Sequence, residues 1–245
     1  MNEIAVEIAC GSLSEVKTAV EAGANRVELC GELALLGGIT PSAGLLNESA
    51  NFLRQAGGGA TELCVMLRPR GGDFCYTDDE FKTMLSDAKV FCEAGVDAIV
   101  FGILKKDCTI DTDRCCELIN FVSNLQKPAG FKPGFVFHRA FDATPDYKES
   151  LDTLKSLNVV RVLSSGCGFS NAEEGAEMLK KMNEHAAGCI EILPGGGVRA
   201  GNVGKILKTS GCKQAHFSLR KNDSHLFSVE ETRAIIQTVK ECGRK

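Results

Sequence analysis

Four ionisable side chains stand inside or at the end of otherwise apolar segments of this sequence: Glu7, Glu28, Arg68 and His138. Burying a charge is expensive unless an opposite charge or a hydrogen bond compensates it, so these groups are expected to cluster. The cluster could perform acid–base catalysis, with Glu7 or Glu28 as the base and His138 as the acid or electrophile. Two alternatives stay open, namely a divalent cation held by Glu7, Glu28 and His138, and a purely structural layer of ion pairs.

Further polar residues follow similar apolar segments and could bind a small anion. Arg68 and Arg70 offer the planar guanidinium geometry that suits carboxylates and phosphates, and Gly71-Gly72 presents Asp73 beside them. Asp142, in the segment HRAFD, is a further catalytic candidate. The other ligand-binding candidates are two serines and a glycine run: Ser164, Ser165, Gly195, Gly196 and Gly197. Glycine lets the backbone approach a ligand, and N–H groups at a following helix start favour an anion, so a phosphate cradle is one interpretation and a tight turn is the other.

The chain contains 12 cysteines, which raises the question of a soft-metal site. Cys10 and Cys30 each stand at the end of an apolar segment, and Cu(I) prefers thiolate and thioether ligands. No C-x-x-C pair or histidine cluster with zinc-finger spacing is present. We expect most of the cysteines to be reduced thiols, and the scattered ones to serve as small apolar residues.

Strand-like and helix-like segments alternate eight times along the chain. The apolar strand-like runs span residues 4–9, 26–30, 63–67, 98–103, 134–138, 159–163, 189–193 and 215–219. Helical spacing of apolar residues is seen at 13–21, 78–93, 111–125, 173–184 and 229–241. Strands joined by helices must run parallel, and eight such units fit one closed (β/α)8 barrel. We therefore predict a single TIM-barrel domain over residues 1–245, with the polar residues at the C-terminal ends of its strands.

Residues that commonly end or cap helices punctuate these segments. The predicted helix-ending glycines are Gly23, Gly95, Gly211 and Gly243. The predicted caps near helix starts are Asp113, Ser150 and Ser228.

Composition excludes several classes of partner. A net charge of -4, from 28 Lys+Arg and 32 Asp+Glu, argues against nucleic acid and anionic membranes. No stretch approaches the roughly 20 apolar residues of a membrane span, and MNEIAVEIAC lacks the pattern of a signal peptide, so a cytoplasmic protein is expected. The first strand–helix turn lacks a G-x-G-x-x-G fingerprint, so no nucleotide cofactor is expected.

The segments NRVELC, GGITPS, RPRGGDFCY, FHRAFD, VLSSG and PGGGVR occur in this order, and the chain resembles the CutC copper homeostasis family over most of its length. The resemblance implies a TIM barrel, a cytoplasmic homo-oligomer, and a role in copper homeostasis with Cu(I) bound by cysteine. Cys30, in VELC, matches one copper ligand of the family. The other position falls at Ala9, so Cys10 could complete the pair only if the strand has ended before it.

Two classes of function therefore stand. The resemblance and Cys30 favour a copper homeostasis protein whose partner is a copper ion. The polar strand ends favour a lyase or isomerase that acts on a small phosphorylated or carboxylated metabolite. We expect Cys30→Ser to impair only the first function, and Arg68→Ala or His138→Ala to impair only the second.

Overall fold

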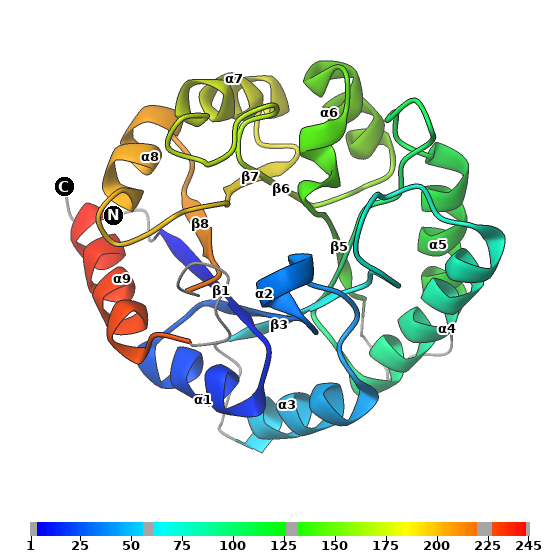
Figure 1. Cartoon of the computed structure of the whole chain (residues 1–245), viewed down its shortest axis with the longest axis horizontal. Coiled ribbons are helices and arrows are strands. Elements are labelled where there is room, and N and C mark those ends of the chain that lie inside the picture. Colours follow the sequence, from blue (N-terminus) through cyan, green and yellow to red (C-terminus); the bar gives the residue numbers. More distant parts are fainter. Residues whose placement is uncertain (1–3, 56–60, 126–131, 220–226, 244–245) are drawn as a thin grey trace.

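A computed structural model of the chain describes residues 4–55, 61–125, 132–219 and 227–243. Parallel strands form a ring inside a circle of helices, with the strand order β7-β6-β5-β4-β3-β2-β1-β8 (Figure 1). The strands are β1 (Ala5–Cys10), β2 (Arg26–Leu29), β3 (Glu62–Met66), β4 (Ala98–Phe101), β5 (Gly134–Phe137), β6 (Arg161–Ser164), β7 (Glu191–Pro194) and β8 (Gln214–Phe217). At the gap between β7 and β8, the Gln214 side chain donates a hydrogen bond to the Ile192 carbonyl at 3.3 Å. The predicted (β/α)8 barrel is confirmed.

Helices connect successive strands and cover the outside of the ring. They are α1 (Leu13–Ala22), α2 (Leu33–Leu36), α3 (Ala43–Gln55), α4 (Asp78–Ala94), α5 (Thr112–Asn124), the 3-10 helix η1 (Arg139–Ala143), α6 (Tyr147–Ser156), α7 (Ala176–Ala186), α8 (Val203–Ser210) and α9 (Val229–Cys242). The short helix α2 differs from the others, because it lies over the strand ring and not in the outer circle (Figure 1). Among the described residues, no helix is long and apolar enough to cross a membrane.

The helix ends agree with the glycine pattern and only partly with the predicted caps. Glycine follows the last residue of α1, α4, α8 and α9, as predicted: Gly23, Gly95, Gly211 and Gly243. Ser228 caps α9 as predicted. The predictions at Asp113 and Ser150 are wrong, because the carboxylates of Asp111 and Asp146 accept the first free N–H groups of α5 and α6.

Several strand ends differ from the predicted ones, with consequences for the site. Predicted strands 98–103 and 215–219 run two residues too far, since Ile103 and Leu219 are fully buried without belonging to the ladder. An apolar pattern reports burial and therefore misses this boundary. The first predicted strand, 4–9, ends one residue too early, because the ladder of β1 continues through Cys10, which pairs with Leu29.

The barrel interior is divided into two clusters of side chains. Parallel register aligns Glu7 with Arg26 on one neighbouring strand and with His216 on the other, so the three share a layer. The apolar interior cluster consists of Cys30, Cys64, Met66, Ala98, Val100 and Val136. The polar interior cluster consists of Glu7, Arg26, Glu28, Arg161, Gln214 and His216, all buried. Charged groups therefore fill the part of the barrel interior beside the β7–β8 gap and extend to the mouth of the barrel, where the C-terminal ends of the strands lie.

Candidate active site

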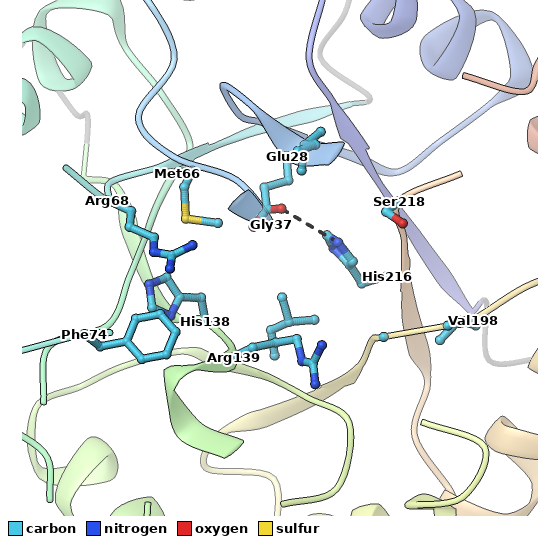
Figure 2. A pocket seen from close by; sticks show the side chains of 14 residues that line it. Glu28, Gly37, Met66, Arg68, Phe74, His138, Arg139, Val198, His216 and Ser218 are labelled. Carbon is cyan, nitrogen blue, oxygen red and sulfur yellow. Dashed lines mark ion pairs between the residues drawn. The ribbon is translucent and has the colours of Figure 1, made fainter. Parts of the chain in front are cut away.

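A cavity of about 210 Å³ opens at the C-terminal ends of the strands. Glu28 and His216 lie on one side of it, and Arg68, Phe74 and His138 lie on the other (Figure 2). The remaining lining residues are Leu33, Gly37, Met66, Arg139, Leu163, Gly196, Gly197, Val198 and Ser218. A small ligand in this cavity would contact ionisable groups on two opposite sides.

A chain of hydrogen bonds and ion pairs links the cavity to the barrel interior. The Nδ1 atom of His216 donates to Glu7 Oε1 at 2.8 Å, and Arg26 Nε donates to Glu7 Oε2 at 2.9 Å. On the other face of the imidazole, Nε2 is 3.7 Å from Glu28 Oε2. Glu7 is therefore a buried anion that fixes the orientation of His216 toward Glu28.

Burial and neighbouring charges separate the pKa values of the two glutamates. Burial alone would raise the pKa of Glu7, but the hydrogen bond from His216 and the charge of Arg26 hold it well below its usual range. Burial raises the pKa of Glu28, and the nearby Glu7 charge adds to this, although His216 opposes it. Burial would lower the pKa of His216, yet the charges of Glu28 and Glu7 raise it. The Glu28–His216 pair is therefore built to hold a proton, whereas Glu7 is not.

The same three residues could in principle hold a cation. Ligand atoms of Glu7, Glu28 and His216 lie within 4.8 Å of one another. The histidine of this group is His216 and not the predicted His138, which lies across the cavity. Arg26 at 2.9 Å and Arg161 at 4.0 Å already supply positive charge to Glu7. These residues therefore fit a proton-holding cluster better than a divalent cation, which would be repelled by both guanidinium groups.

His138 directly follows the last residue of β5 and caps the N-terminus of η1. Its Nδ1 atom accepts a hydrogen bond from the Ala140 N–H at 3.1 Å, and the residue is 3% exposed. Burial and the charge of Arg68 lower the pKa of His138 to about 3. His138 is therefore a neutral imidazole at physiological pH, which favours the electrophile among the two roles predicted for it.

The two predicted anion-binding arginines are committed to protein groups. Arg68 donates from Nη1 and Nη2 to the backbone carbonyls of Leu36, Gly38 and Gly72 at 2.7–3.1 Å, which ties α2 to the loop after β3. Arg70 is bound to Glu80 and Asp73 and does not line the cavity. The predicted ligand role of Asp73 meets the same obstacle, because its carboxylate holds Arg70 and the Cys75 N–H.

Asp142, Ser164 and Ser165 form a connection between loops and do not line the cavity. Asp142 accepts hydrogen bonds from both serine hydroxyls and from the backbone N–H groups of Ser165 and Cys167. Arg139 donates to Asp142 Oδ2 at 2.9 Å and to Ser165 Oγ at 2.9 Å. These contacts hold the side chain of Arg139, which does line the cavity.

The glycine run lies beside Arg139. Gly196 and Gly197 line the cavity, whereas Gly195 does not, and a side chain at Gly195 would overlap Leu163. Gly196 has φ +92°, and a β-carbon there would lie 3.3 Å from Nη1 of Arg139. The predicted helix start is further away, because α8 begins only at Val203. An anion at this place would therefore meet backbone and a guanidinium, and not a helix N-terminus.

The two cysteines predicted as copper ligands lie on opposite faces of the sheet. Cys30 belongs to the apolar interior cluster, whereas Cys10 packs in the layer between strands and helices. Cys10 is the last residue of β1, and side chains alternate along a strand, so the condition for a Cys10–Cys30 pair is not met. The Cys30 thiol donates to Glu28 Oε2 at 3.4 Å, and burial and the Glu28 charge raise its pKa well above the usual value.

The candidate site residues chosen from the sequence did not include Arg26, Arg139, Arg161 or His216, although Arg139 and His216 stand at strand ends where such residues were expected. Three of them carry a readable signal, because alternation along RVEL places Arg26 on the same face as Glu28, and Arg161 and His216 likewise interrupt apolar runs. Arg139 directly follows His138 in FHRAFD, but its place at the cavity depends on the loop held by Asp142.

The fold and the cavity define a (β/α)8-barrel protein with a buried glutamate–histidine pair at the carboxyl ends of its strands. The CutC family matches residues 4–221, and the chain belongs to this family. It is 44% identical over 221 residues to a CutC family protein of Treponema denticola, covering 90% of this chain and 83% of that one. It is 37% identical over 219 residues to the human "Copper homeostasis protein cutC homolog", covering 89% and 74% respectively.

A solved structure supports the same assignment. The crystal structure of a CutC protein from Streptococcus agalactiae superimposes with a TM-score of 0.79 at 36% identity, and covers 87% of this chain and 97% of that one. The resemblance seen in the sequence motifs is confirmed.

Proposed function

We propose that this CutC family member is a lyase or isomerase that moves a proton on a small phosphorylated or carboxylated metabolite. The observation that carries the proposal is the state of the Glu28 carboxylate. Glu28 lines the cavity, its buried Oε1 atom has no hydrogen-bond partner among the described residues, and its Oε2 atom lies beside His216 and Cys30. A buried carboxylate oxygen without a partner is costly, and a substrate C–H or O–H group in the cavity would supply one.

The surroundings of Glu28 suit a general base. Burial raises its pKa, so the carboxylate is a stronger base than a carboxylate in water. The neighbouring His216 can hold positive charge because Glu7 lies 2.8 Å from its other nitrogen. A proton taken by Glu28 can thus be shared with His216 without leaving the barrel.

The substrate also needs a binding place for its anionic group, and we assign this place to Arg139 and the glycine run. Asp142 and Ser165 fix two nitrogens of the Arg139 guanidinium, and its third nitrogen, Nη1, lies beside Gly196. Arginine binds carboxylates and phosphates with paired hydrogen bonds. Backbone at Gly196 and Gly197 lets a phosphate or carboxylate approach without steric hindrance.

The test is a thermal-shift screen of small phosphorylated and carboxylated metabolites, followed by 1H NMR of the stabilising compounds in D2O. We expect wild type to exchange or convert at least one ligand, and Glu28→Gln to bind it without turnover. The control is Glu62→Gln, whose side chain is 54% exposed at the other end of the barrel. Equal turnover by wild type and Glu28→Gln, or no ligand in the whole panel, would contradict the proposal.

Copper homeostasis is the second candidate, and a different observation favours it. Cys30, Cys64 and Met66 lie together in the apolar interior cluster beneath the cavity, and sulfur donors are what Cu(I) prefers. Copper would have to displace protons from two thiols whose pKa values burial raises. The relatives' role therefore fits this chain best if Cu(I) is a cargo of Cys30, Cys64 and Met66, and not of Cys10.

An anaerobic Cu(I) titration against a competing chelator tests this candidate. Stoichiometric binding that is lost in Cys30→Ser and Cys64→Ser, and retained in Cys10→Ser, would support it. Cys10→Ser is the matched control because Cys10 is equally buried on the other face of the strand. Copper binding that is unchanged in Cys30→Ser and Cys64→Ser would contradict this candidate function. The cytoplasmic location and the homo-oligomer remain predictions, of which the second is checked by light scattering.

A further inference from the structure

The tautomer of His138 follows from its hydrogen bonds. Its Nδ1 atom accepts the Ala140 N–H at 3.1 Å, so this nitrogen carries the lone pair. In a neutral imidazole the proton then resides on Nε2. That nitrogen is buried and has no hydrogen-bond partner among the described residues. His138 lines the cavity and therefore carries an N–H donor that no described residue accepts.

Arg68 lies in the same wall, and its terminal nitrogens are held by backbone carbonyls. Arg68 stacks over the Phe74 ring at 4.9 Å, and the Phe74 and His138 ring centroids are 5.0 Å apart. Figure 2 shows the three side chains together on the side of the cavity opposite Glu28 and His216.

The surroundings hold His138 neutral and fixed in place. Burial and the charge of Arg68 both oppose an imidazolium, and they lower the pKa of His138 to about 3. A β-carbon at Gly102 would overlap the His138 ring, so the ring packs directly on the strand backbone. A neutral, immobile N–H donor suits a site where negative charge develops on an oxygen, because no reorganisation is needed when the charge appears.

We infer that the Nε2–H group of His138 binds a carbonyl oxygen of the substrate, and that the substrate is a small carbonyl compound with an anionic group whose α-proton Glu28 removes. This inference rests on the proposed function and narrows it to enolisation chemistry. In the step, the C–H bond α to the carbonyl breaks and its proton goes to Glu28 Oε1. The electron pair of that bond forms a C=C bond, and the carbonyl π electrons move to the oxygen that His138 holds. Return of the proton completes an isomerisation or an exchange.

Matched ligand pairs test the carbonyl requirement apart from anion binding. The pairs are pyruvate with lactate, and dihydroxyacetone phosphate with glycerol 3-phosphate, and in each the first member has a carbonyl where the second has a hydroxyl. The variants are His138→Phe, which keeps an aromatic ring, and His138→Gln, which keeps an N–H donor. Affinity is measured by calorimetry, α-proton exchange by NMR in D2O, and folding by circular dichroism.

We expect wild type to favour the carbonyl member of at least one pair by roughly tenfold and to exchange its α-protons. His138→Phe should lose both the preference and the exchange, His138→Gln should retain part of the preference, and Glu28→Gln should lose only the exchange. In wild type labelled with 15N, His138 should show the Nε2–H tautomer.

Equal affinity for both members of each pair, unaffected by His138→Phe, would overturn this inference while leaving an anion-binding enzyme in place. An Nδ1–H tautomer or an imidazolium at neutral pH would overturn it as well. Failure of all four ligands would overturn it too, whereas the proposed function is judged by the wider metabolite panel.

Discussion

Glu7 and His216 are register partners on the adjacent strands β1 and β8, and the Glu7 carboxylate accepts a hydrogen bond from His216 Nδ1 at 2.8 Å. The same carboxylate accepts from Arg26 at 2.9 Å. One buried anion therefore accepts hydrogen bonds from two basic side chains, and the layer depends on its charge. The predictions below begin with this residue.

Glu7→Gln should destabilise the fold strongly. The substitution leaves Arg26 and Arg161 buried without their shared anion, and removing one partner of a buried pair typically costs about 3–5 kcal/mol. Urea unfolding followed by circular dichroism measures the loss. Glu191→Gln is the control, since Glu191 also contacts Arg161 but its side chain is 59% exposed, so less than about 1 kcal/mol is expected. Similar losses in the two variants would show that burial does not govern this ion pair.

His138 should make the fold less stable in acid. Its folded pKa of about 3 lies below the usual histidine value of 6.5, so the unfolded state binds more protons between these values. The contribution of His138 is thus fully present above pH 6.5 and is lost as the pH falls, with a slope approaching about 1.4 kcal/mol per pH unit.

The measurement compares urea unfolding of wild type and His138→Gln from about pH 7 to about pH 4.5. As the pH falls, the free energy of unfolding of wild type should decrease relative to that of His138→Gln, because glutamine does not titrate. A difference that is independent of pH would mean that the folded protein accommodates a charged His138.

Gly102→Ala should damage both stability and ligand binding. The added methyl would overlap the His138 ring and the Ala140 methyl, and overpacking of this kind costs about 1–3 kcal/mol. Displacement of His138 should also weaken any ligand that the thermal-shift screen identifies. Gly201→Ala is the control because nothing lies within 4 Å of the added atom. Wild-type ligand affinity in Gly102→Ala would show that the position of His138 is unimportant for binding.

The interior thiols should be unreactive in the native protein. Burial raises the pKa of Cys30 and Cys64, and only the thiolate attacks an alkylating reagent or an aromatic disulfide. Cys108 and Cys189 are exposed and should react first, as peptide mapping after brief iodoacetamide treatment can show. Early modification of Cys30 would mean that the mouth opens enough to admit reagents, and would favour the copper role.

The barrel itself could be predicted from the sequence, because each strand is a short apolar run that helices separate from the next. Boundaries were less predictable. Ile103 and Leu219 are buried outside the ladder and extend the apolar pattern past the strand end, whereas Cys10 is still in the ladder. Whether Cys10 and Cys30 lie on the same face of the sheet depended on whether β1 ends before or after Cys10.

The candidate site was partly predictable for a similar reason. Glu28 and His138 stand out as ionisable residues at the ends of buried runs, and both line the cavity. The roles of Arg68 and Asp142 were not readable, because backbone carbonyls and N–H groups from distant loops satisfy them. Side-chain type indicates what a residue can bind, but only the fold shows what it does bind.

The side chain of Gln214 bridges the β7–β8 gap at the foot of the barrel and also accepts a hydrogen bond from Arg26 at 2.6 Å. Arg26 contacts Glu7, Glu7 contacts His216, and His216 faces Glu28 at the mouth. The contacts that hold His216 beside Glu28 therefore begin at the opposite end of the molecule. An uncharged exchange at Gln214 would reach Glu28 only through Arg26, Glu7 and His216, and would leave the residues that line the cavity unchanged.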